Sequence, residues 1–219
     1  MNIFNYIASA VRTLPMKGRR NALKILTLGI GLSVGLVLTS KVCFEQTFDD
    51  FYDGADRIYY LSEAVELNGS YRVFSSVSGG MAPKLKEYFP QIEDATRFTY
   101  IQYESTAVLE ESGRRVNAGR ACLADTSLFR ILDRPCLAGN ITGSLDIEGN
   151  VVISSSLASK VTSALTSGGK MNERAAAASV LGRKFALAGY DGDVMLTISG
   201  VYEDFPLNSS YRPDIVIAL

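Results

Sequence analysis

The stretch KILTLGIGLSVGLVLTSKV, residues 24–42, decides the architecture of this chain because it has the length and polarity of a membrane span. No residue from 25 to 40 is charged, and Lys24 and Lys41 flank the run. The long side chains of these lysines can reach outward to the headgroups, so the run extends to about 20 residues, the length that a bilayer requires. We therefore predict a transmembrane helix over residues 22–44.

Other interpretations of the run fit less well. A soluble core helix would carry a polar stripe at helical spacing, whereas only Thr27, Ser33 and Thr39 interrupt this run, with hydroxyl groups that can bond back to their own helix. A cleaved signal, or a lipoprotein signal with Cys43 as the modified residue, would have a shorter basic leader and small residues at the cleavage site, where this chain has Lys41. The lipoprotein interpretation stays open as an alternative.

The charges on the two sides of the run differ in sign, which orients the helix. Residues 1–24 contain basic residues and no acidic one, whereas residues 45–56 are rich in carboxylates. Because basic flanks stay in the cytoplasm, we expect residues 1–21 to form a cytoplasmic amphipathic helix and basic turn. Residues 45–219 would then form a domain outside the cytoplasm. Phe44, Phe48 and Phe51 continue the helical spacing and predict a stalk between helix and domain.

Glycines within the predicted span indicate close helix packing. Gly29, Gly31 and Gly35 gain nothing from helix propensity, and the last two are four residues apart on one face. Small residues at this spacing allow another membrane helix to approach closely. We therefore expect helical neighbours on this face.

The composition argues against an enzyme. The chain has no histidine and no tryptophan, so imidazole-based catalysis and most zinc sites are excluded, and we predict no catalytic residue, metal or cofactor. Lysine plus arginine (22) nearly balances aspartate plus glutamate (23), which gives no basic field for nucleic acid. Cys43, Cys122 and Cys136 lack metal-binding spacing, although Cys122 and Cys136 flank one predicted helix and could pair as a disulfide.

The residues after the span indicate an α+β domain with interleaved helices and strands. Strands are expected on both sides of the turns at LNGS (67–70), ESG (111–113) and Asp191-Gly192, and helices over 82–90, 125–132 and 154–165. Asp125 is expected to cap the second of these helices. The alanine-rich stretch 166–180 is expected to be an irregular connection.

Several segments, in order, resemble the N-terminal part of the MacB/FtsX-type ABC transporter permeases. They are FDDFYDGADRIYYL (48–61), APKLKEYFPQIEDATRF (82–98), LADTSLFRILDRPCLAGN (123–140), VVISSSLASKV (151–161), LGRKFAL (181–187) and LTISGVYEDFPLNSSYRPDIVIAL (196–219). The last contains a family signature carried here by Gly200, Val201, Asp204, Pro206, Asn208 and Ser209. The alanine-rich stretch departs from the family, which has a short turn before the LGRKF position.

This resemblance implies a first membrane helix followed by a MacB-like periplasmic core domain over 45–219, with two subdomains and an insertion over about residues 110–190. It further implies a permease subunit, or its N-terminal part, in an ATP-driven export or mechanotransmission complex. The implied partners are a cytoplasmic ABC ATPase subunit, a second permease subunit in a homodimer or pair, membrane lipid, and a periplasmic adaptor or outer-membrane protein. Because the chain stops in an expected strand, DIVIAL, we expect it to be part of a longer permease.

A different class of function is a single-pass, membrane-anchored binding or sensory protein. Its outer domain would recognise a ligand and its cytoplasmic arm would signal inward. Residues 1–21 are short for a signalling domain, which favours the permease.

Overall fold

The computed structural model describes residues 6, 9, 19–166, 171–189 and 194–219, which fall into two compact units, residues 1–48 and 49–219. The expected amphipathic helix before residue 19 and the expected turn at Asp191-Gly192 lie outside the described residues. The two units are described separately.

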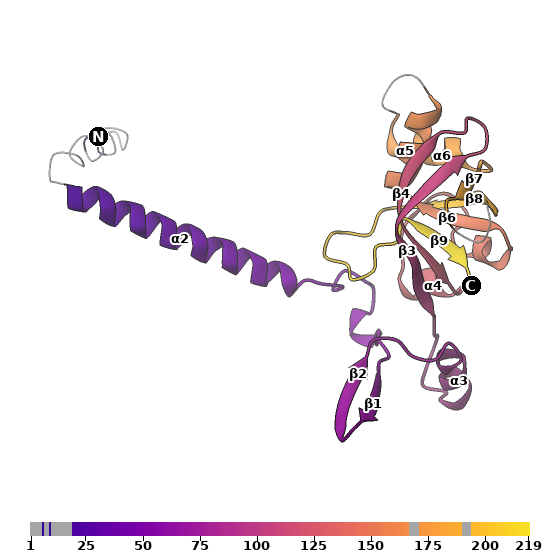
Figure 1. The fold of residues 1–219 in the computed structure, drawn as a ribbon, viewed down its shortest axis with the longest axis horizontal. Coiled ribbons are helices and arrows are strands. Elements are labelled where there is room, and N and C mark those ends of the chain that lie inside the picture. Colours follow the sequence, from indigo (N-terminus) through magenta and orange to yellow (C-terminus); the bar gives the residue numbers. More distant parts are fainter. Residues whose placement is uncertain (1–5, 7–8, 10–18, 167–170, 190–193) are drawn as a thin grey trace. The chain divides into compact units, whose positions relative to one another are not determined.

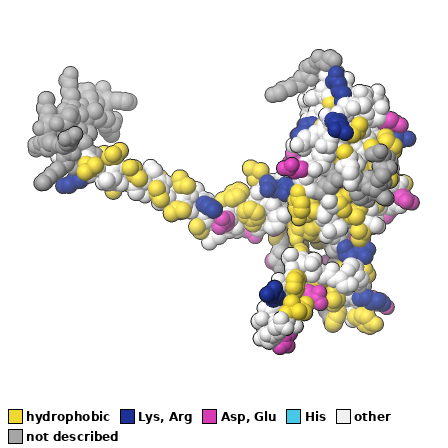
Figure 2. Space-filling model, viewed as in Figure 1, with side chains coloured by type: hydrophobic (Ala, Val, Ile, Leu, Met, Phe, Trp, Pro, Cys, Tyr) yellow, Lys and Arg dark blue, Asp and Glu magenta, His cyan; other side chains and the backbone are white. Residues whose placement is uncertain are grey.

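The first unit is dominated by one long helix, α2 (Arg19–Glu45). Its segment Leu23–Glu45 has a mean hydropathy of 1.8 and is long and apolar enough to cross a membrane. Figure 2 shows hydrophobic side chains along its visible face, with charges only near its ends. Hydroxyl groups of the interrupting residues donate to carbonyls one turn back, Ser33 to Gly29 and Thr39 to Gly35, both at 2.8 Å, as expected. The helix therefore satisfies the hydroxyl groups of Ser33 and Thr39 with its own backbone carbonyls.

The expected helical stalk ends earlier than the phenylalanine spacing predicted. α2 stops at Glu45, and turns follow through Gly54. Asp49 has a φ of 58°, a left-handed conformation that no α-helical path contains. Phe51 packs instead on Tyr52, with ring centroids 4.1 Å apart, at the start of the second unit.

The second unit contains short helices and nine strands within its described residues. The strands are β1 (Glu63–Leu67), β2 (Ser70–Phe74), β3 (Phe98–Leu109), β4 (Arg115–Ala124), β5 (Cys136–Gly139), β6 (Asn150–Ser154), β7 (Lys184–Leu187), β8 (Met195–Tyr202) and β9 (Ile215–Ala218). The helices are η1 (Ala55–Arg57), α3 (Met81–Tyr88), α4 (Leu128–Ile131), η2 (Gly143–Asp146), α5 (Ser155–Leu165) and α6 (Glu173–Val180).

Seven strands form one sheet that closes on itself. Their order is β5-β8-β6-β9-β4-β3-β7, and β7 also pairs with β8, which completes a ring of six strands with β5 attached to β8. The pairs β4–β9 and β6–β8 are parallel, and the others are antiparallel. The four strands of residues 115–187, which are β4 to β7, therefore belong to the same sheet as β3, β8 and β9 and do not form a sheet of their own.

Alternating side chains of the central strands fill two separate cores. In β6, Val151 and Ile153 face a core that includes residues of α5 and α6, whereas Val152 faces a second core with α4 and Tyr52. All three β6 valine and isoleucine side chains are fully buried. Figure 1 shows α5 and α6 at one end of the sheet and α4 at the other. A strand buried on both faces needs the continuous apolar run that VVI supplies.

A hairpin and a helix form an arm that is separate from the ring. β1 and β2 pair only with each other, around Asn68 and Gly69, which both have positive φ, as the expected turn requires. α3 follows, and residues 89–97 lead from it into β3. Every residue of β1 and β2 except Val65 is exposed.

Two local expectations were wrong. The stretch expected to be an irregular connection contains α6, which Asn172 caps by accepting a bond from the Ala175 backbone N–H at 2.7 Å. The alanines Ala176 and Ala177 are buried, so tertiary packing favours the helix. Asp125 does not cap α4 with its side chain, because its carboxylate is bonded to Arg97.

Candidate functional site

The glycines of the predicted packing face lie in the middle of α2. A Cβ atom built on Gly29, Gly31 or Gly35 meets nothing within 4 Å. The structure thus places these residues on open helix surface. Their role in packing stays a prediction.

The first two signature residues belong to β8, where close packing explains the glycine and core burial explains the valine. Gly200 pairs with Val152, and a Cβ atom at Gly200 would lie 2.9 Å from the Asn140 carbonyl oxygen. Val201 is fully buried in the core that contains α5. These residues hold the end of β8 against the turn that follows β5.

Asp204 ties the segment after β8 to the N-terminus of α5. Its Oδ1 accepts hydrogen bonds from the Ser155 hydroxyl and the Ser156 backbone N–H, both at 2.9 Å, and its Oδ2 contacts the Ser156 hydroxyl. A carboxylate at this position also favours the positive end of the helix dipole. Ser154 is the N-cap of α5, as expected, and accepts from the Leu157 N–H.

The remaining signature residues hold the start of the second unit, residues 49–219. We call residues 49–58 the junction segment and residues 203–211 the signature loop. The Asp49 backbone N–H donates to the Asn208 carbonyl at 2.9 Å. In return, the Asp49 carboxylate accepts from the Ser209 hydroxyl at 3.2 Å and from the Ser210 N–H at 2.9 Å. Pro206 closes the turn, because its carbonyl accepts from the Ser209 N–H.

Ser209 is the centre of this contact. It is 2% exposed, and its hydroxyl lies 3.1 Å from the Tyr52 hydroxyl and 2.9 Å from the Tyr211 carbonyl. Since serine carries one hydroxyl hydrogen, Tyr52 is the donor whenever Ser209 points to Asp49 or Tyr211. Burial raises the pKa of Tyr52 to about 12, against an opposing effect of the Ser209 hydrogen bond. Tyr52 is therefore a neutral donor at physiological pH.

Arg134, from the segment before β5, reinforces the same contact. Its guanidinium lies over the rings of Phe51, in the junction segment, and Phe205, in the signature loop, at 5.9 and 5.5 Å. It donates to the backbone carbonyls of Glu203 at 3.1 Å and Asp204 at 2.8 Å. Its side chain is 11% exposed, so these cation–π and hydrogen-bond contacts are largely shielded from water.

The structure does not bring Cys122 and Cys136 together. Both are free thiols, one buried on β4 and the other exposed on β5. Three strands, β8, β6 and β9, lie between β4 and β5 in the sheet order, so the two cysteines are on strands that do not pair with each other, and no disulfide joins them in the structure. Cys43 lies exposed near the end of α2.

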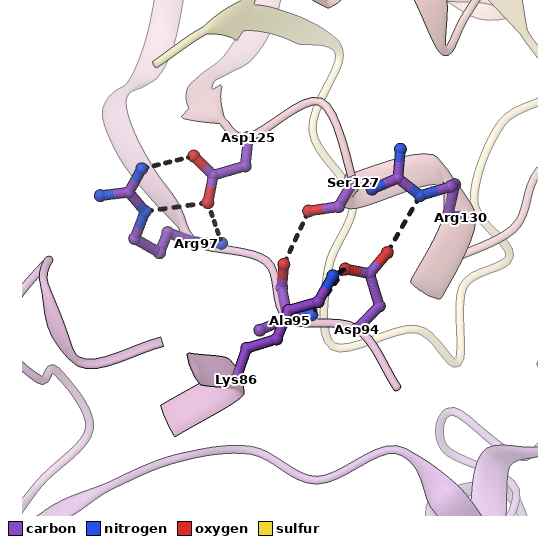
Figure 3. Close-up of polar contacts among 7 residues, drawn as sticks. All are labelled: Lys86, Asp94, Ala95, Arg97, Asp125, Ser127 and Arg130. Atoms are coloured by element: carbon purple, nitrogen blue, oxygen red, sulfur yellow. Dashed lines mark hydrogen bonds and ion pairs between the residues drawn. The ribbon is translucent and has the colours of Figure 1, made fainter. Parts of the chain in front are cut away.

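A charged hollow lies where the arm meets the ring (Figure 3). It has a volume of about 320 Å³ and is lined by charged residues of α3, the 89–97 segment and the region around α4. Arg97 forms a fork on Asp125, with its Nε and Nη2 at 2.8 and 2.7 Å from the two carboxylate oxygens. Its Nη1 donates to the Gly79 carbonyl at 2.9 Å, so all three nitrogens of Arg97 are bonded.

The second carboxylate of the hollow, Asp94, is shared by two cations. Lys86 of α3 lies 2.7 Å from its Oδ1, and the Nε of Arg130 of α4 lies 2.9 Å from its Oδ2. Burial alone would raise the pKa of Asp94, but the hydrogen bonds from Lys86 and Arg130 outweigh it, and the pKa lies below the usual value. Asp94 is therefore ionised and joins α3 to α4.

Sequence reasoning found the signature loop but not its partners. Arg134 and Tyr52 carry no local pattern, and Asp49 lies within the acidic stretch 45–56, which indicated the orientation of the helix but no contact. Among the described residues, no group of three or more histidine, cysteine, aspartate or glutamate side chains could hold a metal ion. The hydrogen bonds and ion pairs described above hold the junction segment to the signature loop, and α3 to α4.

Solved permease domains resemble this chain. One is described as "a domain of a putative Permease protein from Porphyromonas gingivalis"; it is 30% identical, with a TM-score of 0.54, over 68% of this chain and 55% of that chain. The periplasmic region of MacB from Actinobacillus actinomycetemcomitans is 15% identical, with a TM-score of 0.39, over 58% of this chain and 48% of that chain. At this identity and TM-score, the similarity to MacB supports no conclusion about this chain. No family model and no curated protein matches the chain.

The Porphyromonas domain confirms the expected resemblance to a permease domain. The expected fold class is confirmed too: one apolar N-terminal helix precedes a mixed α+β domain. The chain spans about half the length of the solved domains that it matches, 55% and 48%.

Proposed function

We propose that this chain is a permease subunit, or the N-terminal part of one, in an ATP-driven export or mechanotransmission complex of a bacterial inner membrane. In this proposal α2 is an uncleaved first membrane helix with its N-terminus in the cytoplasm. The domain over 49–219 lies in the periplasm, and an ABC ATPase in the cytoplasm supplies the movement. Further membrane helices of the permease pack on the face of Gly31 and Gly35, and a second permease subunit completes the complex.

The observation that carries the proposal is the attachment of the junction segment to the signature loop. Asp49, the first residue of the outer domain, is bonded through both its backbone and its carboxylate to residues 208–210. Tyr52 and Phe51 add a buried hydrogen bond and a cation–π contact. The signature loop joins β8 to β9, which are both central strands of the ring. A displacement of the junction segment is therefore passed to the sheet instead of being lost in a flexible linker.

The exposed native thiols offer a direct test. Cys43 near the end of α2 and Cys136 on β5 are exposed, whereas Cys122 is buried, so spin labels can be placed on the first two without substitutions. In membranes that also hold the cognate ABC ATPase, we expect a narrow distribution of distances between the labels that shifts when ATP is added.

Matched variants separate the parts of the proposal. Ser209→Ala should broaden the distribution, while Ser210→Ala should not, because Ser210 contacts Asp49 only through its backbone N–H. Equal distributions in the two variants would contradict transmission through the junction segment. A narrow distribution that ATP leaves unchanged would instead favour the anchored binding or sensory protein.

A further inference from the structure

We propose that the charged hollow is a binding site for a phosphate group, held by Arg130 and Lys86. This inference concerns the region between α3 and α4 and does not depend on the proposed function.

The first support is the unequal use of the cations that line the hollow. All three guanidinium nitrogens of Arg97 donate hydrogen bonds to Asp125 or to the Gly79 carbonyl, so this residue holds the structure and has no nitrogen without a partner. Arg130 uses only its Nε, on Asp94, and no described residue accepts from its two terminal nitrogens. Figure 3 shows those nitrogens directed away from the Asp94 carboxylate. Lys86 uses one donor of three on the same carboxylate.

The second support is charge. Three cationic side chains (Lys86, Arg97 and Arg130) and two carboxylate side chains (Asp94 and Asp125) line the hollow, so its side chains sum to one positive unit, and Leu219 also lies on its wall. Lys86 and Arg130 are 46% and 54% exposed, so their remaining donors are open to solvent and to a solute. The side-chain charges of the hollow therefore favour an anion over a cation.

The third support is shape. A volume of about 320 Å³ admits a small organic molecule. Because Lys86 and Arg130 bond to the two oxygens of one carboxylate, they are neighbours, and a tetrahedral anion can accept from the arginine fork and from the ammonium group together. Pro83, Ala124 and Leu145 supply apolar wall. The hollow thus suits a phosphate, either free or carried as a monoester by a small molecule.

The proposal is tested by amide NMR of the full chain in maltoside micelles, titrated with inorganic phosphate at constant ionic strength, with chloride as the reference anion. We expect saturable shifts confined to residues 84–87, 94–97 and 125–130, the three segments that line the hollow. Arg130→Gln should weaken binding about tenfold or more, as loss of a charge-assisted hydrogen bond does, whereas Arg174→Gln on α6 should leave binding unchanged. A parallel titration with glycerol 1-phosphate identifies the source, since tighter binding of the ester indicates an organic phosphate and equal binding indicates the free ion.

A second variant guards against simple unfolding of the first. Lys86→Gln removes the other proposed donor, which lies on a different element, α3, so phosphate binding should again weaken about tenfold or more. Unfolding of either variant would change amide shifts throughout the domain before phosphate is added, whereas loss of the site leaves those starting shifts in place. The proposal is overturned if phosphate shifts no residues beyond the chloride reference, if the shifts spread over all basic surface positions, or if Lys86→Gln leaves binding unchanged.

Discussion

The hydrogen bond between Tyr52 and Ser209 should be worth about 1 kcal/mol to the outer domain, and a double-mutant cycle can measure it. Tyr52→Phe removes one hydroxyl, and Ser209 retains Asp49 and Tyr211 as partners, so the expected loss is about 1 kcal/mol. Ser209→Ala leaves the buried Tyr52 hydroxyl without this partner, so its loss should be larger, about 2 kcal/mol. The double variant should lose about 2 kcal/mol, since the partner of each group is already absent.

The assay is urea denaturation of the full chain in maltoside micelles, followed by near-ultraviolet circular dichroism. The chain has no tryptophan, and all of its 11 tyrosines except Tyr6 lie in the outer domain, so the signal reports that domain. A loss of 1 kcal/mol corresponds to about 2–4 °C in Tm for a domain of this size. Tyr88→Phe is the control, because Tyr88 is 71% exposed on α3 and its hydroxyl should matter by less than about 0.5 kcal/mol.

One result would refute this reasoning. If the losses of the two single variants simply add in the double variant, within about 0.3 kcal/mol, the two hydroxyls do not interact in solution. The contact between the junction segment and the signature loop would then lack its buried hydrogen bond.

Three further predictions concern packing and titration. Gly200→Ala should destabilise the outer domain by about 1–3 kcal/mol, because the new methyl group would press on the Asn140 carbonyl, whereas Gly79→Ala, with open space around it, should be nearly neutral in the same urea assay. Burial raises the pKa of Cys122 to about 12, so at pH 8 mass spectrometry should detect alkylation at the exposed Cys136 and none at Cys122 until the domain unfolds. The raised pKa of Tyr52, about 12 against about 10 in the unfolded chain, means that stability falls between pH 10 and 12, and Tyr52→Phe should lessen that fall.

Elements with local sequence signals could be predicted. The hairpin of β1 and β2 depends on Asn68 and Gly69, which accept positive φ, and the start of α5 depends on the Ser154 cap. Such signals act over a few residues, so one sequence suffices to read them. The apolar run of α2 is equally local, and its length and hydropathy were evident before the structure.

Long-range pairings could not be predicted. The parallel pairs β4–β9 and β6–β8, and the closure of β7 on β8, join strands that are far apart in the chain. No local pattern specifies such partners, because their stability comes from burial on both faces. The expectation for Asp125 failed for the same reason, since its partner, Arg97, is 28 residues earlier and outweighs the local helix end.

The charged hollow could not be predicted from the sequence either. Its residues come from α3, the 89–97 segment and α4, and each is an ordinary surface charge when read alone. Only the folded arrangement shows that Arg130 and Lys86 converge on one carboxylate.

The position of β9 has a consequence for how the protein is made. β9, Ile215–Ala218, lies between β4 and β6 in the middle of the sheet, so neither core is complete until these residues have left the ribosome. The apolar helix at the other end of the chain emerges almost 170 residues earlier, since it ends at Glu45. Membrane insertion of α2 can therefore precede folding of the domain, which stays open to chaperones and proteases throughout its synthesis.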